Sequence, residues 1–390
     1  MNIHAPRLFL RLRGRAAALL AALLLSAAPL RAQVLPGPVG ADSLSSTLVP
    51  VIAYSSDEGW VGGAVYSRIS YRGDDEPFHS YLQASALVST KGFVEIQARR
   101  EQLTTFGRSL RSEAEIFLNR YAFNNYFGVG NTTTFSRDRW DDEYYFFDDL
   151  GVGGAFRLRH PLHRREESRL DLSMGLASEY HISYVRKEDS RFFQARPNGD
   201  EGGWVNLLES GLIWENRDSE FDPRRGARFD LKVRFAPHGL SDFDFTTVRL
   251  TMRHYFRLLG FVTVAQRLQG RHAGGDVPYW ELSRLGDDHT LRGFPLNRFQ
   301  GRSSLSYTLE LRTWLVEFPA YGLKFGGQLF TDTGRVFTSE DDTGDLLEDY
   351  HQTFGFGGAM SAFNPDFILR GDIGFSEDMV RLYIGIGYMF

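Results

Sequence analysis

The amino-acid sequence predicts an all-β protein, a 16-stranded antiparallel transmembrane β-barrel with one long loop folded into its lumen. Three observations lead to this fold class. Apolar and polar residues alternate along most of the chain, the alternating segments number sixteen, and the longest connections between them fall at one end of the predicted barrel. This period of two residues is typical of strands, and a convincing helical period is missing after the amino-terminal segment.

Residues 1–32 are typical of a secretory signal peptide. Four arginines between Arg7 and Arg15 form a basic start, residues 16–30 are almost entirely apolar, and Ala32 precedes the expected cleavage site. The apolar run is shorter than the roughly 20 residues of a membrane-spanning helix, although an uncleaved anchor is the alternative. We expect export to the bacterial outer membrane, with residues 33–46 as a short periplasmic tail and the barrel over 47–390.

The composition agrees with a membrane barrel. The chain has 40 Gly, 32 Phe and 17 Tyr, no Cys, a net charge of -5 and a mean hydropathy of -0.29. Low average hydropathy is expected because only every second residue of a barrel strand faces lipid. The charge is modest and the sequence has no dense basic patch, so we expect no nucleic-acid partner.

The alternation defines the strands one after another. Residues 227–235 are the clearest case, with apolar odd positions and charged even positions. Most segments reach the roughly 9–11 residues that a tilted membrane strand needs. The expected strands lie near 47–55, 60–71, 78–90, 92–101, 107–119, 143–159, 168–185, 203–216, 226–237, 243–259, 261–273, 303–315, 321–332, 352–361, 366–375 and 379–390.

The loop lengths also follow the barrel pattern. The longest connections are residues 120–142, 186–202, 274–302 and 333–351, which are the fifth, seventh, eleventh and thirteenth in order. All are odd-numbered, so in an up-and-down barrel they lie at the same end. Long external loops and short periplasmic turns are the arrangement known for outer-membrane barrels.

A closed barrel requires the first and last strands to pair, because unpaired backbone groups in lipid are costly. Pro50 lies inside the first strand and cannot donate a ladder hydrogen bond, and Gly385 and Gly387 weaken the last strand. These residues indicate a soft lateral seam. Ordinary tolerance of Pro and Gly at strand edges is the alternative.

The longest loop contains a candidate clamp, Leu291-Arg292-Gly293-Phe294. Strand parity directs Glu310 and Asp332, on the next two strands, into the lumen. An arginine fork suits carboxylates, so we expect the loop to fold inward and Arg292 to pair with both. A solvated Arg292, or simple turn chemistry at Asp332 and Gly334, are the alternatives.

A second motif lies in the connection between the eighth and ninth strands. Asp218, Asp222, Pro223 and Gly226 are residues that favour tight turns, so a structural role in a periplasmic turn is expected. The segment NNYFGVGN at 124–131 is expected to shape an external loop or the barrel rim, without chemistry.

Together these motifs resemble the BamA-like bacterial surface-antigen family. The resemblance covers residues 47–390, with its specific motifs in 214–390, and it implies a loop arginine held by an acidic pair, here Arg292 with Glu310 and Asp332. Tyr383, Gly385, Tyr388 and Phe390 are similar to the terminal strand signal of outer-membrane barrels. That likeness implies the barrel assembly machinery as a partner in the protein's own insertion. Residues 33–46 are too few for a POTRA domain, so a version without POTRA domains is expected.

The expected function is therefore outer-membrane protein or lipid assembly or transport, of the insertion and translocation type. The expected surroundings are outer-membrane lipid, and a client protein or periplasmic partner is left unidentified. A passive porin or structural barrel is the alternative. An outer-membrane enzyme is less favoured, because the ten His residues are scattered without nucleophile or metal-ligand spacing. We expect no cofactor and no metal.

Overall fold

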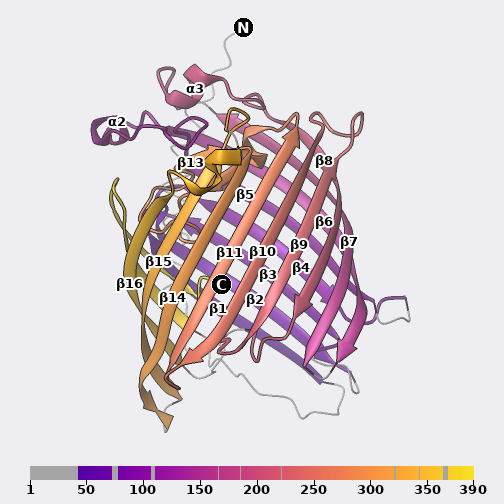
Figure 1. Ribbon diagram of the computed structural model, residues 1–390. Helices are drawn as coiled ribbons and strands as arrows, with labels where there is room; N and C mark the ends of the chain where they lie inside the picture. Colours follow the sequence, from indigo (N-terminus) through magenta and orange to yellow (C-terminus); the bar gives the residue numbers. More distant parts are fainter. Residues whose placement is uncertain are drawn as a thin grey trace, which may run out of the picture.

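A closed antiparallel barrel of sixteen strands forms the body of the computed structural model (Figure 1). The described residues are 43–72, 78–106, 110–165, 167–184, 186–220, 222–319, 322–341, 343–362 and 368–390. The expected signal peptide, and the expected tail up to residue 42, lie outside them. Around the barrel the strand order is β1-β18-β17-β16-β15-β14-β11-β10-β9-β8-β7-β6-β5-β4-β3-β2.

The barrel strands have the following bounds: β1 (Ser43–Ser55), β2 (Gly59–Tyr71), β3 (Ser80–Ser89), β4 (Val94–Gln102), β5 (Arg111–Asn125), β6 (Phe146–Arg165), β7 (Ser168–Tyr184), β8 (Gly203–Glu215), β9 (Gly226–Ala236), β10 (Phe245–Leu258), β11 (Val262–Gly275), β14 (Ser303–Phe318), β15 (Leu323–Phe337), β16 (His351–Ala362), β17 (Ile368–Phe375) and β18 (Val380–Ile386). The first strand begins at Ser43, so it includes the last residues of the segment expected as a tail.

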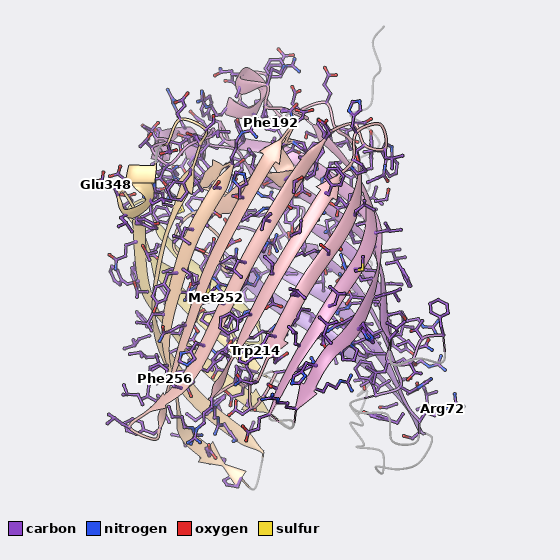
Figure 2. The ribbon with its side chains drawn as sticks, turned by 45° about the vertical axis from the view of Figure 1, so that its right-hand side comes forward. Arg72, Phe192, Trp214, Met252, Phe256 and Glu348 are labelled. Atoms are coloured by element: carbon purple, nitrogen blue, oxygen red, sulfur yellow. The ribbon has the colours of Figure 1, made fainter. Side chains whose placement is uncertain are left out.

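Strand parity separates the two faces of the wall. On β15, Leu329 points outward and is 60% exposed, whereas Asp332 points inward and is fully buried. Met252 and Phe256 lie on the outer side of β10 (Figure 2). Among the described residues no helix combines the length and apolar character needed to cross a membrane.

The long connections gather at one end of the barrel, as their parity predicts. They follow β5, β7, β11 and β15, and they contain α2 (Arg137–Asp141), α3 (Arg191–Ala195), η1 (Tyr279–Glu281), the short strands β12 (Ser283–Leu285) and β13 (Phe299–Gly301), and η3 (Thr343–Leu347) (Figure 1). We call this the loop end.

An apolar core lies at the loop end, under these connections. Phe192 of α3 stacks on Phe147 of β6 with ring centroids 4.1 Å apart, and both rings pack edge-on against Tyr279. Figure 2 shows Phe192 at this end. The loops are therefore packed against each other and against the barrel mouth, which fixes the position of the loop that enters the lumen.

The last strand ends earlier than the sequence predicts, at Ile386 rather than at Phe390. Gly387 adopts a positive φ of 83° and donates its N–H to the carbonyl of Ile368 at 2.7 Å. The following residues turn into the barrel, where Met389 is buried and the Phe390 ring faces that of Tyr255, with centroids 6.2 Å apart. The expected strand over 379–390 is wrong in this final part.

Candidate functional site

The candidate site is the loop between β11 and β14, which folds into the lumen. Within it β12 and β13 pair as a short antiparallel ribbon, with Arg284 opposite Gln300. Beyond the ribbon, Leu285, Leu291 and Phe294 form a buried apolar cluster with Phe299 and Val336. This cluster anchors the loop to the upper part of β15 and directs the next side chain toward the wall.

That side chain is Arg292, which is fully buried. Its Nε and Nη2 atoms donate to the two carboxylate oxygens of Asp332 at 2.9 and 3.0 Å. Its Nη1 atom forms an ion pair with Glu310 at 2.6 Å. The structure therefore brings together the three residues that the sequence suggests as a clamp.

Two further contacts of Arg292 were missed by sequence reasoning. Nη1 donates to Asp372 of β17 at 3.2 Å, and the guanidinium lies 3.4 Å from the centroid of the Phe330 ring. Alternation within β17 directs Asp372 inward, so the same parity rule applied to that strand would have found it. The position of Phe330 beneath the guanidinium depends on the tertiary packing.

The carboxylates around Arg292 also contact other arginines. Arg312 Nη2 lies 2.6 Å from Glu310, and Arg370 Nε lies 3.4 Å from Asp372. The group therefore contains three cations and three anions, and we call Arg292, Glu310, Arg312, Asp332, Arg370 and Asp372 the clamp cluster. Such a buried group is held by mutual pairing, and removing one member leaves an uncompensated charge.

A close backbone approach seats the loop on β17. Gly293 has a φ of 109°, and a Cβ built there would lie 2.9 Å from the carbonyl carbon of Phe375. A Cβ at Gly374 would lie 2.6 Å from the carbonyl carbon of Arg292. Ser376 donates its hydroxyl to the Gly293 carbonyl at 2.9 Å. Both glycines are therefore needed where the loop meets the strand.

Gly334 and Phe294 complete the expected clamp residues. Phe294 is buried in the apolar cluster of the loop. Gly334 lies on β15, and a Cβ there would come 3.0 Å from Cδ1 of Leu285. Both residues therefore serve the packing of the loop rather than direct contact with the guanidinium.

We call the loop between β11 and β14 the inner loop. The segment 124–131 covers the inner loop at the loop end. Asn125 donates to the carbonyl of Leu296 at 2.9 Å, and Gly130 donates its N–H to the carbonyl of Gln300 at 2.8 Å. Arg298 of the inner loop donates in turn to Thr133, through two hydrogen bonds of 2.7 Å. This segment, to which the sequence assigned no chemistry, joins the inner loop to the neighbouring long loop as a lid.

The expected turn motif forms a compact turn between β8 and β9. Asp218 Oδ1 accepts from the backbone N–H of Arg224 at 2.9 Å and that of Arg225 at 3.2 Å. Asp222 accepts from Trp314 Nε1 at 3.2 Å, Pro223 is buried, and Gly226 has a φ of 97°. The turn is thus fixed by local hydrogen bonds and tied to β14.

The seam between β1 and β18 is short. Tyr54 pairs with Ile384 and Ser55 with Tyr383, and no other register pairs join the two strands within the described residues. By contrast β1 pairs with β2 along its whole length, with Pro50 opposite Ala64. Gly385 pairs with Arg370 of β17 and not with β1. Among the residues that the structure describes, β1 from Ser43 to Ala53 therefore has no strand partner on the side of β18.

The seam is reinforced at the loop end. Arg381 forms an ion pair with Asp57 and donates to the carbonyl of Ser56 at 3.1 Å. Asp57 also accepts the backbone N–H of Leu296, from the inner loop, at 3.0 Å. The inner loop thus contacts the turn after β1 as well as the wall formed by the last strands.

The four residues of the expected C-terminal signal are divided between wall and lumen. Tyr383 points inward from β18, where its hydroxyl accepts the N–H of Gly293 at 3.3 Å. The guanidinium of Arg312 lies 4.1 Å from the ring centroid of Tyr388 and 4.9 Å from that of Phe390. The side chains of Tyr388 and Phe390 therefore contact Arg312 of the clamp cluster inside the lumen.

The model of the Omp85 superfamily domain matches residues 99–390. BamA from Haemophilus ducreyi lacking POTRA domains 1-3 has a similar structure, with a TM-score of 0.59 and 13% identity, covering 89% of this chain and 71% of that one. CdiB from Escherichia coli gives a TM-score of 0.60 at 13% identity, covering 91% and 64%. CdiB from Acinetobacter baumannii gives 0.53 at 12% identity, covering 89% and 66%. The chain therefore spans about two thirds of the length of these proteins. No curated protein sequence matched significantly.

Proposed function

The chain belongs to the Omp85 superfamily, and we propose that its barrel acts in outer-membrane protein or lipid assembly or transport through the seam between its first and last strands. The observation that carries the proposal is the short pairing of β1 with β18, limited in the described residues to Tyr54 with Ile384 and Ser55 with Tyr383. A free strand edge exposes backbone donors and acceptors that can pair with an incoming strand.

The contacts around the seam support this proposal. The last residues leave the wall at Gly387 and contact Arg312 in the lumen instead of extending β18. The edge of β1 from Ser43 to Ala53 is therefore not covered by β18. Because unpaired backbone groups are costly in lipid, this edge favours a partner segment or an adjustment of the seam.

A passive porin is the alternative function, and the loop end opposes it. The inner loop is held to the barrel wall by the ion pairs of Arg292 in the clamp cluster. The lid segment 124–131 is in turn bound to the inner loop through Asn125 and Gly130. A wide aqueous channel needs an unobstructed lumen. We propose further that the barrel acts by binding and passage rather than by catalysis.

An in vivo crosslinking experiment tests the seam. A photoreactive amino acid replaces Leu48, on the outer face of β1, and a matched one replaces Leu231, on the outer face of β9 far from the seam in the strand order. Tyr54→Cys with Ile384→Cys introduces a disulfide across the seam of a chain that has no native cysteine. We expect protein or lipid adducts from position 48 that are lost when the disulfide forms, and no such change at position 231.

The opposite result is equally clear. Identical adducts at positions 48 and 231, or adducts at 48 that persist in the oxidised double-cysteine variant, would contradict a role for the seam. Ion flux through the purified barrel that is unchanged by the disulfide, together with absent adducts, would favour the passive porin instead.

A further inference from the structure

Two rows of cationic side chains cross the inner wall of β9, β10 and β11. Register partners on the three strands form the rows, which are Lys232–Arg249–Arg271 and Arg228–Arg253–Arg267. Residues an even number of positions apart on one strand point to the same face, so both rows face the lumen. Like charges directly opposite each other destabilise a sheet, so this arrangement requires compensating anions.

Protein carboxylates compensate part of this charge. The pairs are Lys232 with Glu209 at 2.8 Å, Arg228 with Asp230 at 2.8 Å, Arg253 with Asp230 at 3.1 Å, and Arg271 with Glu281 at 2.8 Å. Every member of the two rows except Arg249 and Arg267 thus has a carboxylate within 4 Å in the described part of the chain.

Arg249, Arg267 and Arg284 face this wall without an ion pair to any carboxylate that the structure describes. The side chains of Arg249 and Arg284 form no hydrogen bond or ion pair with any described residue. Arg267 is 6% exposed and donates to neutral atoms, the carbonyl of His289, the hydroxyl of Thr308 at 3.4 Å and the sulfur of Met389 at 3.9 Å. A buried guanidinium without an anion is unfavourable, so an anion from outside the chain would be stabilising here.

These three arginines, together with Arg271, line one hollow of about 480 Å³ between the inner loop and the wall. This volume lies within the range of roughly 300–1,000 Å³ typical of small-molecule sites. Arg249 remains accessible to solvent inside the barrel, because it faces this hollow and a second one of about 300 Å³ on the same wall.

The two carboxylates that line the hollow are engaged elsewhere. Asp149 accepts from the hydroxyl of Tyr279 at 2.7 Å, and Asp287 accepts from the backbone of His289 and the hydroxyl of Thr290, both at 2.8 Å. A buried donor also remains: Trp280 lines the hollow, and its Nε1 has no hydrogen-bond partner among the described residues. The hollow thus presents donors and positive charge in excess of acceptors.

We propose that this hollow binds a phosphate-bearing anion, with Arg249, Arg267 and Arg284 as its principal ligands. Guanidinium groups recognise phosphate through paired hydrogen bonds, and arginine-lined pores are selective for anions and phosphate. A low-dielectric wall lined with one sign of charge also concentrates the opposite ion. The proposal is independent of the seam and of its role in translocation.

Chemical footprinting of the purified full-length barrel tests the site without any variant. Phenylglyoxal modifies accessible guanidinium groups, and mass spectrometry reports each arginine separately. Pyrophosphate is expected to protect Arg249 and Arg284 at least about tenfold more strongly than Arg257, which is exposed at the far end of β10. Equal protection of all three residues, or equal protection of the hollow by citrate, would overturn the assignment to phosphate.

Paired variants provide the second test. Arg249→Gln with Arg267→Gln removes two of the proposed ligands, whereas Arg137→Gln with Arg257→Gln removes the same charge from exposed positions. We expect pyrophosphate affinity, measured by calorimetry in micelles, to fall about tenfold or more in the first variant and to stay unchanged in the second. Equal losses in both would show non-specific attraction and overturn the proposal.

Two arms distinguish a soluble ligand from a lipid headgroup. Glycerol 3-phosphate is added to barrels in phosphatidylcholine nanodiscs, and separate nanodiscs contain phosphatidic acid without added solute. Protection of Arg249 in the first arm identifies a soluble phosphate, and protection in the second arm alone identifies a headgroup. Absence of protection in both arms would overturn the site.

Discussion

The hydroxyl of Tyr383, on the last strand of the barrel, accepts a hydrogen bond from the backbone N–H of Gly293 at 3.3 Å. This contact joins the strand that forms the seam to the loop that holds Arg292. Leu296 of the same loop donates to Asp57, which follows the first strand. The inner loop therefore contacts both sides of the seam, and its stability and that of the seam are linked.

Loss of the Arg292 side chain is expected to destabilise the folded barrel strongly. Arg292→Ala leaves Asp332, Glu310 and Asp372 without their shared cation, and breaking a buried ion pair typically costs about 3–5 kcal/mol. The unfolding midpoint in urea and the protease protection of the inner loop measure this. Arg137→Ala, at an exposed pair with Asp141, is the control and should change stability by less than about 1 kcal/mol. Equal midpoints for the two variants would contradict the clamp.

Crowding at the loop contact is expected to make Gly293→Ala more harmful than an alanine at another left-handed glycine. Strain at a positive φ costs of order 1–3 kcal/mol at either position. At Gly293 the new Cβ also meets the backbone of Phe375 at 2.9 Å, whereas Gly260, with a φ of 80°, has no atom within 4 Å. A larger shift of the unfolding midpoint for Gly293→Ala than for Gly260→Ala is expected. Similar shifts would show that backbone strain alone is responsible.

Stability of the turn between β1 and β2 is expected to decrease as the pH rises from about 5 to 8. Burial, followed by the charges of Asp288 and Asp57, raises the pKa of Glu58 from 4.5 to about 7. The folded state therefore binds a proton that the unfolded state has already released in this range, and its advantage is lost above pH 7. Hydrogen exchange of this turn measures the effect, and Glu58→Gln should remove most of the pH dependence. An unchanged dependence in that variant would contradict this assignment.

The position of Phe390 inside the barrel is expected to contribute to stability after folding. Phe390→Ala removes the ring that faces Arg312, Arg267 and Tyr255, and cation–π contacts contribute about 0.5–2 kcal/mol each. The purified variant, folded in detergent, should unfold at a lower urea concentration than the wild type. Phe256→Ala, on the outer side of β10, is the matched control. A defect seen in cells but not in detergent would instead indicate a role of Phe390 in insertion alone.

The barrel itself was accessible from sequence because alternation is a local property. Strand number and the end that holds the long loops follow from it directly, and parity also places Glu310 and Asp332 inward. The pairing of Arg292 with these carboxylates could be proposed because an arginine that a loop carries into the lumen needs an anionic partner once buried.

The parts that sequence reasoning missed depend on tertiary contacts. Alternation continues through Gly387 to Phe390 in sequence, and nothing local indicates that the chain turns inward to meet Arg312. The lid formed by 124–131 depends on backbone hydrogen bonds with the inner loop, such as that of Gly130 with Gln300. Such bonds leave no side-chain pattern in the sequence.

The equal number of cations and anions in the clamp cluster has a consequence for any movement of the inner loop. With Arg292 withdrawn, the remaining groups on the wall are Glu310, Asp332 and Asp372 against Arg312 and Arg370, an excess of one negative charge. A segment in the place of the loop would leave this charge uncompensated within the cluster unless it carried a cationic side chain of its own.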